Sequence, residues 1–560
     1  MQMPVQDVSK KILSKQIDKQ DAMRLFRSLD KESQSQVLAI LRRADGVAQA
    51  HDGKGAARAL KALDLREITG EHRAWIAALV EQYDRFVPTS RANALEHRIH
   101  FVDPRRPVHP IEALKPLQFQ ITRTRAEGAY VHDADGHRYI DISGDASLFG
   151  HHAPFLIDAL RHALDQGIPL AGCSDAIFRA CRSFCEITGH ERALFTPSAA
   201  EAVLSAVRIA RAATGRRKIV LFADNGFERA PGILQDVADQ IIVLGFGDTA
   251  SLDAIEQRAG EIASVLVEPA QSRHADKTPA EFLKALRKLT IEKNIALIFD
   301  ETITGFRACP QGAQGRFGIQ ADMATYGDVV GGGLPTGVIA GASKYMDLID
   351  AGAGTSDDDS TPRAGRTAMV ASHSQNPLTI AAALAVLGEV RTRCGDGVQS
   401  CDGCTCFQRT LSDKTARLAD TLNAFFGEER LPVVIDTFGS LFRFRFVDGD
   451  RGVPEALFFT LLRMEGVETR SQGDCFLSTA HTDEDIEAVI AGVKASLSNL
   501  KRNGFFREPD EEPAQAAAPQ PETTAFAAPQ SGNASHRNDM ERLKALLAAD
   551  LALAEESGNH

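Results

Sequence analysis

Four short apolar runs separated by helical stretches constrain the fold of this chain more than any other feature. The runs are KIVLF (218–222), QIIVLG (240–245), SVLVEP (264–269) and ALIFD (296–300). Strands that read as continuous apolar runs are buried on both faces, and their alternation with helices is typical of a parallel sheet between helical layers. The sequence therefore predicts an α/β large domain with a mostly parallel sheet over about residues 150–345.

Further strands and helices are predicted on both sides of this domain. Asp135 and Gly136 lie between two alternating segments, a pattern that is typical of a tight β-hairpin. Residues 433–498 alternate between strand-like and helical patterns, which predicts a small α+β C-terminal lobe. We therefore expect a body over residues 75–507 that contains an N-terminal segment, the large domain and this lobe.

Both ends of the chain differ from this body in composition. Residues 1–50 repeat apolar positions at helical spacing, so we interpret them as a helical extension and candidate docking element, followed by a linker over residues 51–74. Residues 508–537 are rich in Pro and Ala and cannot repay the entropy of ordering, which predicts a second linker. Residues 538–560 return to helical spacing, which predicts a C-terminal amphipathic helix with a partner.

The charge of the chain limits its partners. The 560 residues carry a net charge of -12 and the pI is about 5.8, so no broad basic surface is available for nucleic acid or anionic lipid. No apolar run is long enough to span a bilayer, and the N-terminus lacks the apolar core of a signal peptide. We therefore expect a cytoplasmic protein without nucleic acid or membrane partners.

Four cysteines fall close together in the segment RCGDGVQSCDGCTCFQ. They are Cys394, Cys401, Cys404 and Cys406. Four thiolates are enough to hold a tetrahedral zinc ion or an iron-sulfur cluster, and part of the segment has the C-x2-C spacing that is common in zinc sites. The full spacing is not a standard metal motif, so free thiols in a surface insertion are the alternative.

Several motifs of the body occur in an order and spacing that one protein family shares. They include EITGHERALF, LVEPAQSR, LIFDETITGFR, VVGGGLPTGVIAG and FLSTAHTDEDI. Over residues 75–505 the chain resembles class III aminotransferases, in particular glutamate-1-semialdehyde aminomutases and the aminotransferase domains of polyketide and nonribosomal peptide assembly lines. The resemblance implies the PLP-dependent transferase fold of type I, pyridoxal 5'-phosphate (PLP) as cofactor and a homodimer.

Two acidic residues match positions that the family places beside the cofactor. Asp300, in LIFDETITGFR, matches the acid that faces the pyridine nitrogen and keeps it protonated, so that the ring can accept electrons from a carbanion. Glu268, in VEP, matches another position near the cofactor. Without the resemblance, each would be an ordinary carboxylate in a turn or helix cap after a buried strand.

The family's phosphate-binding segment is altered here. In the family the phosphate lies at a helix N-terminus in a Ser-Gly-Thr-Glu-Ala segment, whereas this chain has Ser198, Ala199 and Ala200. The glycine and the threonine hydroxyl are both lost, so we expect a weakened phosphate site. By the same resemblance, Phe227 replaces a histidine of the aromatic pair that stacks on the ring, and Ser372 replaces a phosphate-binding threonine contributed by the partner subunit.

The position of the family's Schiff-base lysine carries an aspartate. In the family a Tyr-Gly-Lys segment precedes a glycine-rich turn, and here that segment reads Tyr326-Gly327-Asp328. A carboxylate cannot form a Schiff base, so Asp328 can act only as a base, and PLP binding itself becomes doubtful. Lys344 lies beyond the glycine turn, and we expect it to be an ordinary surface lysine.

These features leave different functions open. The first is a degenerate relative without ordinary transaminase activity, which serves as a scaffold or partner-binding protein in a natural-product pathway and docks an assembly-line or carrier protein. The alternative is an active enzyme that uses PLP or pyridoxamine phosphate (PMP) on a small or carrier-bound amino or keto substrate. It would be an aminotransferase, an aminomutase or a lysine-independent enzyme with Asp328 as base.

Overall fold

The computed structural model describes residues 68–102, 112–144, 147–168, 173–222, 240–271, 280–350, 367, 374–394, 406–447, 452–469 and 474–506. These residues belong to one compact unit that extends from Leu65 to Arg507. The predicted extensions over residues 1–50 and 538–560 and the linker over residues 508–537 lie outside the described residues, as does most of the linker predicted before the body.

The strands of the large domain are β4 (Arg192–Thr196), β5 (Lys218–Phe222), β6 (Ile241–Leu244), β7 (Ile262–Val267), β8 (Ala296–Glu301), β9 (Met323–Tyr326) and β10 (Gly337–Gly341). In the described part of the chain they form one sheet in the order β4-β10-β9-β8-β7-β5-β6. β10 is antiparallel to both neighbours, and the other neighbouring pairs are parallel. The predicted α/β fold with a mostly parallel sheet is therefore confirmed.

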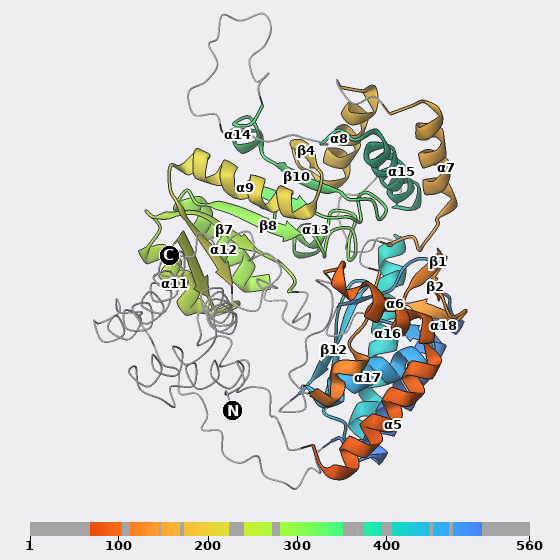
Figure 1. Ribbon diagram of the computed structural model, residues 1–560. Helices are drawn as coiled ribbons and strands as arrows, with labels where there is room; N and C mark the ends of the chain where they lie inside the picture. The colour runs from red at the N-terminus through yellow and green to blue at the C-terminus, as the bar shows by residue number, and fades with distance from the viewer. Residues whose placement is uncertain are drawn as a thin grey trace, which may run out of the picture. The chain divides into compact units, whose positions relative to one another are not determined.

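The helices of this domain are α7 (Pro154–Asp165), α8 (Asp175–Thr188), α9 (Ala199–Thr214), α11 (Thr249–Gln257), α12 (Ala280–Glu292), α13 (Ala313–Phe317), α14 (Ser343–Met346) and α15 (Pro377–Cys394). α9 lies along one face of the sheet and packs against β4, β7, β8, β9 and β10 (Figure 1). None of the described helices is long and apolar enough to cross a lipid bilayer.

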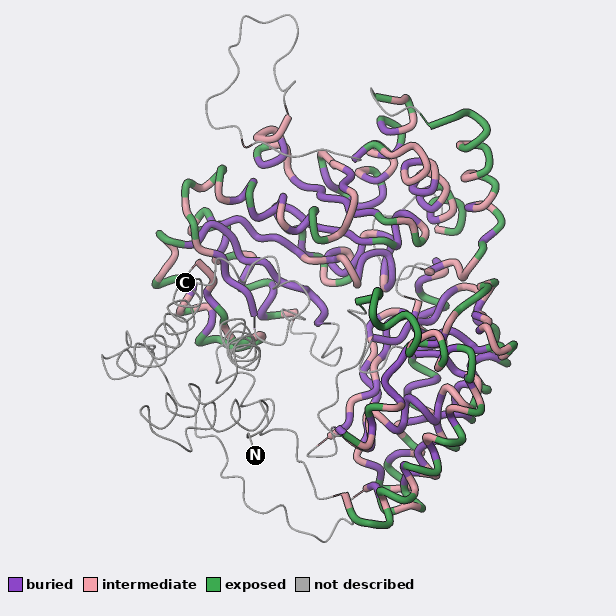
Figure 2. The backbone as a smooth tube through the Cα atoms, in the orientation of Figure 1, coloured by how far each residue is buried: buried purple, intermediate pink, exposed green. Residues whose placement is uncertain are grey.

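The two faces of β8 belong to different parts of the core. Ala296 and Ile298 pack in the cluster that contains the buried side of α9, whereas Leu297 and Phe299 pack in the cluster that contains Phe282 of α12. Successive side chains of a strand point to opposite faces of the sheet. The two clusters therefore show on which face the side chains of the last residues of β8 lie. The strands are the most buried part of this domain, and the outer sides of the helices are exposed (Figure 2).

The N-terminal elements of the body are α5 (Gly70–Phe86), α6 (Pro88–Glu96), η1 (His97–Ile99), η2 (Glu112–Leu117), β1 (Arg123–Glu127), β2 (Tyr130–Asp133) and β3 (Arg138–Asp141). As predicted, β2 and β3 form an antiparallel hairpin, and Gly136 in its turn has a φ of 90°. α5 begins earlier than expected, because the hydroxyl of Thr69 accepts the backbone N–H of His72 and caps the helix. Residues 70–74, which the sequence predicts to be linker, are therefore helical.

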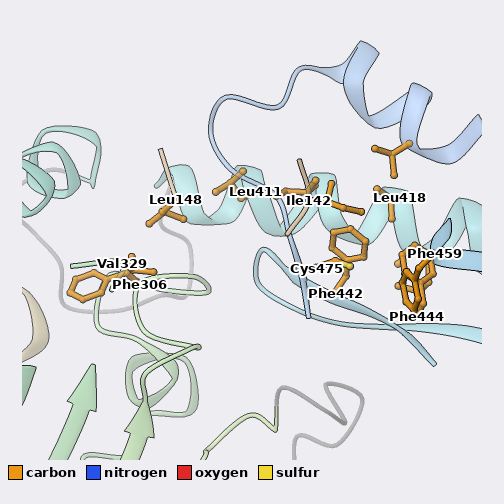
Figure 3. Packing of buried hydrophobic residues seen from close by; sticks show 14 of the residues in the cluster. Ile142, Leu148, Phe306, Val329, Leu411, Leu418, Phe442, Phe444, Phe459 and Cys475 are labelled. Atoms are coloured by element: carbon orange, nitrogen blue, oxygen red, sulfur yellow. The ribbon is translucent and has the colours of Figure 1, made fainter. Parts of the chain in front are cut away.

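The small lobe, residues 406–506, contains α16 (Phe407–Glu428), β11 (Val433–Phe438), β12 (Leu441–Phe446), α17 (Val453–Met464), β13 (Val467–Glu468), β14 (Cys475–Phe476) and α18 (Asp483–Arg502). β11, β12 and β14 form a sheet, while β13 joins the N-terminal strands by pairing in parallel with β3. Figure 3 shows Phe442, Phe444 and Phe459 gathered in the core of this lobe. The predicted small α+β lobe is confirmed, and the N-terminal segment packs with it.

Candidate functional site

Four of the predicted site positions come together at one edge of the large sheet. Glu268 directly follows β7, Asp300 lies near the end of β8, and Asp328 follows β9. These three strands are parallel neighbours, so their carboxyl ends meet at the same edge. Ser198 follows β4, whose last residue pairs with the first residue of β10 at that edge. Ligand sites of open α/β sheets lie at the carboxyl ends of the strands, so this edge is the candidate site.

Asp300 is held in place by two hydrogen bonds. Its Oδ1 accepts the backbone N–H of Thr302 at 3.1 Å and the hydroxyl of Thr325 at 3.3 Å. Asp300 keeps some accessible surface although the preceding residues of β8 are buried. The surrounding protein still desolvates its carboxyl, which raises the pKa of Asp300, and the hydrogen bonds from Thr302 and Thr325 oppose this rise. By alternation along β8, the side chain shares the face that carries α9.

The N-terminus of α9 lies at the same edge. Ser198 is its N-cap residue, and the Ser198 hydroxyl accepts the backbone N–H of Glu201 at 3.3 Å. Ala199 and Ala200 are the first residues of the helix, and the first N–H groups of an α-helix have no partner within it. A Cβ on Gly337 would lie 2.2 Å from the Ser198 carbonyl oxygen, so β10 packs tightly against this cap. The backbone can therefore hold an anion here, but the serine hydroxyl already serves the helix.

Asp328 accepts hydrogen bonds from backbone N–H groups within the glycine-rich turn that follows it. Its Oδ1 accepts the backbone N–H of Thr336 at 3.1 Å, and its carbonyl accepts the N–H groups of Gly331 and Gly333 at 3.1 and 3.2 Å. The residue is exposed. A Cβ on Gly327 would lie 2.5 Å from the backbone oxygen of Thr302, so this turn packs against the residue that holds Asp300.

Lys344 lies at the opposite edge of the sheet. Its Nζ is 3.7 Å from Oδ1 of Asp322, and its side chain is 63% exposed. Asp322 precedes β9 and accepts the backbone N–H of Leu297 near the start of β8. A strand rises about 3.3 Å per residue, so Leu297 and Asp300 are on the order of 10 Å apart. Lys344 is a surface lysine, and none of the described lysines lies in the turns that follow β4, β7, β8 or β9.

Other predicted site residues lie outside the described residues. They are Phe227, Ser372, Cys401 and Cys404. Cys394 ends α15 and donates to Oε1 of Gln408 at 3.3 Å, and Cys406 caps the start of α16. Among the described residues no group of three or more His, Cys, Asp or Glu side chains is arranged to hold a metal ion. The zinc or iron-sulfur hypothesis therefore has no structural support.

Glu301 is a buried carboxylate next to the site that the sequence does not single out. It is 1% exposed, and its carboxylate accepts the backbone N–H groups of Ala313 and Gln314 at 2.8 and 2.9 Å and the hydroxyl of Thr304 at 2.9 Å. Burial raises the pKa of Glu301 to about 7, and the nearby charge of Asp300 adds to the rise. The sequence indicates a role for Glu301 only through its position directly after Asp300, because two of the residues that bind its carboxylate lie in the later helix α13.

The comparison with family models decides the assignment. The model described as aminotransferase class-III matches residues 113–251 and 247–497. The chain belongs to the class III aminotransferase family. Its sheet and helices have the PLP-dependent transferase fold of type I, as the resemblance implied.

Curated relatives carry the name glutamate-1-semialdehyde 2,1-aminomutase. The protein from Chloroflexus aurantiacus is 32% identical over 419 residues, which cover 67% of this chain and 89% of the relative. The protein from Deinococcus radiodurans is 30% identical over 461 residues, which cover 74% of this chain and 98% of the relative. This class III aminotransferase-family chain therefore spans nearly the whole of these relatives.

Solved structures agree with this fold. A β-phenylalanine aminotransferase from Variovorax paradoxus superposes with a TM-score of 0.63 at 27% identity and covers 76% of this chain and 97% of its own. A lysine-to-alanine variant of a glutamate-1-semialdehyde aminomutase from Pseudomonas aeruginosa PAO1, in complex with PMP, superposes with a TM-score of 0.62 at 23% identity over the same shares. The second likeness shows the fold alone.

The described residues fit the family's cofactor in part. The carboxylate of Asp300 fits a protonated pyridine nitrogen, and the N-terminus of α9 fits a phosphate through its backbone N–H groups. Asp328 does not fit a covalent link, because it carries no amine. The described part of the site can therefore hold such a ligand only by non-covalent contacts.

We predict that Glu301 makes the stability of the protein depend on pH near neutrality. Its folded pKa of about 7 exceeds its ordinary value of 4.5, so its contribution is fully present below about pH 4.5 and is lost as pH rises through about 7. Between pH 6.5 and 8.5 the free energy of unfolding should fall with pH, by roughly 0.8 kcal/mol from this group. Glu301→Gln should flatten this fall in urea unfolding.

A second buried group titrates near the lower end of this pH range, and it contributes equally to the native protein and to Glu301→Gln, so the difference between the two slopes isolates Glu301. Burial lowers the pKa of His190 to about 4, so its contribution is present above about pH 6.5 and is lost only at lower pH. Glu429→Gln changes a carboxylate that is 45% exposed and should keep the native slope. An unchanged slope in Glu301→Gln would contradict the assignment.

Proposed function

We propose that this class III aminotransferase-family protein lacks ordinary transaminase activity. The observation that carries the proposal is Asp328, which stands in the turn after β9 at the position where the family has its Schiff-base lysine. An amine at this position forms the covalent link to the cofactor and moves protons on the bound substrate, and a carboxylate cannot form that link. The position of Lys344 at the opposite edge supports the proposal, because it cannot take over this role.

On this proposal the protein is a cytoplasmic homodimer that acts as a scaffold or partner-binding protein in a natural-product pathway. The support comes from the resemblance to assembly-line aminotransferase domains and from the helical spacing at residues 1–50 and 538–560. Amphipathic helices on tethers are suited to docking in a groove of another protein. The partner would be an assembly-line or carrier protein.

Turnover and absorbance test the loss of transamination. We expect the native protein with added PLP to convert no amine donor above the rate without protein, because loss of the amine removes a catalytic contribution of at least 100-fold. Asp328→Lys should acquire the yellow absorbance of lysine-bound PLP, whereas Asp328→Asn should stay colourless. Sustained turnover by the native protein would refute the proposal.

A second candidate function is lysine-independent chemistry on a non-covalently bound PMP. It is favoured by Asp300, which remains accessible and is oriented by Thr302 and Thr325. In the Pseudomonas aeruginosa structure PMP is bound by a variant with a lysine changed to alanine, so PMP binding by that protein does not require that lysine. In this reading the substrate is a small or carrier-bound amino or keto compound, and the carboxylate of Asp328 acts as the base.

The two candidates differ in what the site binds. A carboxylate at residue 328 attracts the ammonium group of PMP and has no such partner in the aldehyde of PLP. We therefore expect calorimetry to show about fivefold tighter binding of PMP than of PLP, since an exposed ion pair contributes at most about 1 kcal/mol. Asp328→Asn should remove this preference. A native protein that binds no PMP excludes lysine-independent chemistry and leaves the scaffold function.

A further inference from the structure

The connection between β8 and α13 is closed at both ends by one residue, Glu301. At its start, the backbone oxygen of Glu301 accepts the N–H of Gly305 at 2.9 Å. At its end, the Glu301 side chain accepts the N–H groups of Ala313 and Gln314, the first two residues of α13. This connection, residues 302–312, therefore begins and ends on Glu301.

Close packing leaves the connection little freedom. A Cβ on Gly312 would lie 2.7 Å from Oε1 of Glu301, and a Cβ on Gly305 would lie 2.7 Å from the Glu301 backbone oxygen. Phe306 is buried and has a φ of 64°, a left-handed conformation that is unfavourable for a bulky residue. Such a conformation persists only where the surrounding structure imposes it. The connection is thus held in one strained shape.

One side of this connection supports Asp300. The N–H of Thr302 donates to Asp300, and the backbone oxygen of Thr302 packs against Gly327, next to Asp328. Asp300 and Glu301 are consecutive in β8, so their side chains point to opposite faces of the sheet. Glu301 therefore acts on the site through Thr302 and does not touch it.

The other side of the connection reaches the small lobe. Arg307 is fully buried, and its Nε donates to the backbone oxygen of Ile303 at 2.7 Å, which fixes the guanidinium on the connection itself. Its Nη1 donates to the hydroxyl of Ser440 at 3.4 Å, and the guanidinium lies 4.0 Å from the ring centre of Phe476. Ser440 lies in the turn between β11 and β12, and Phe476 lies in β14, so both partners belong to the small lobe.

We propose that Glu301 is a positioning residue that couples Asp300 to the small lobe through the connection 302–312. With the carboxylate in place, the connection holds Thr302 against Asp300 and Arg307 against Ser440 at the same time. A movement of the small lobe therefore changes the orientation of Asp300, and a ligand on Asp300 favours one position of the lobe. Glu301→Gln disturbs the bonds to Thr304 and to the start of α13, because the new amide group turns a donor toward groups that donate to the carboxylate.

Hydrogen exchange followed by mass spectrometry of the full-length protein tests this coupling. In Glu301→Gln we expect amides in residues 297–306 and in residues 439–446 to exchange about tenfold faster than in the native protein. Faster exchange confined to α13, with residues 439–446 unchanged, would overturn the proposal.

The N-terminal hairpin offers a control with the same chemistry. Asp133 is a buried carboxylate that also accepts two backbone N–H groups, from Asp135 and His137, and a hydroxyl, from Tyr139. Asp133→Asn should speed exchange in its own hairpin and leave residues 297–306 unchanged. If it changes them equally, a general loss of stability explains the result and the coupling is refuted.

A second variant tests the coupling by changing the contact with the small lobe. Arg307→Lys keeps the charge but loses the flat guanidinium that binds Ile303 and lies over Phe476. Arg307→Lys should speed hydrogen exchange in residues 297–306. If Glu301→Gln does not fold, this variant still tests whether the small lobe and Asp300 are coupled. Exchange that rises only in residues 439–446 would show that the two parts are independent.

A ligand measurement adds a readout that rests on the proposed PMP site. If the native protein binds PMP, Glu301→Gln should weaken that binding about tenfold, whereas Asp133→Asn should not change it. Equal PMP affinity in the native protein and Glu301→Gln would refute the positioning role. Absence of PMP binding in the native protein would reject the lysine-independent function, and the exchange experiment would still decide the coupling.

Discussion

The parallel register between β8 and β9 is the constraint on which the rest of the site depends. It pairs Asp300 with Thr325 and Glu301 with Tyr326, and the alternation of side chains sends the two acids to opposite faces. Asp300 therefore shares the face of α9, while Glu301 is enclosed on the other face. A slip of one residue would exchange their positions, leaving the candidate site without its anchored carboxylate.

The framework around this site is tightly packed. Gly337 packs against the cap of α9, and Gly327 packs against Thr302. Asp328 contributes to this framework, because its carboxylate binds Thr336 across the glycine-rich turn. If Asp328 occupies the lysine position, as proposed, it is accommodated there by a local hydrogen bond, which fits a chain that keeps the framework of the site without its covalent chemistry.

The sequence predicts the parallel core and the edge that carries Asp300, because buried parallel strands leave uniform apolar runs that local patterns reveal. The sequence does not predict β10. Its segment GVIAG is short and bounded by glycines, and its strand partners β4 and β9 are known only from the structure. The roles of Glu301 and Arg307 are also hidden, since their partners come from distant parts of the chain. The use of the Ser198 hydroxyl as a helix cap, in contrast, could be predicted from the sequence, because Glu201 follows three residues later in the S-x-x-E pattern of a helix start.

Borohydride reduction of the full-length protein with PLP, followed by peptide mass spectrometry, tests the central claim most directly. We predict no stoichiometric pyridoxyl group on any lysine of the native protein and a stoichiometric one at the introduced amine of Asp328→Lys. A stoichiometric pyridoxyl-lysine in the native protein would show that another lysine serves the site and would contradict the account.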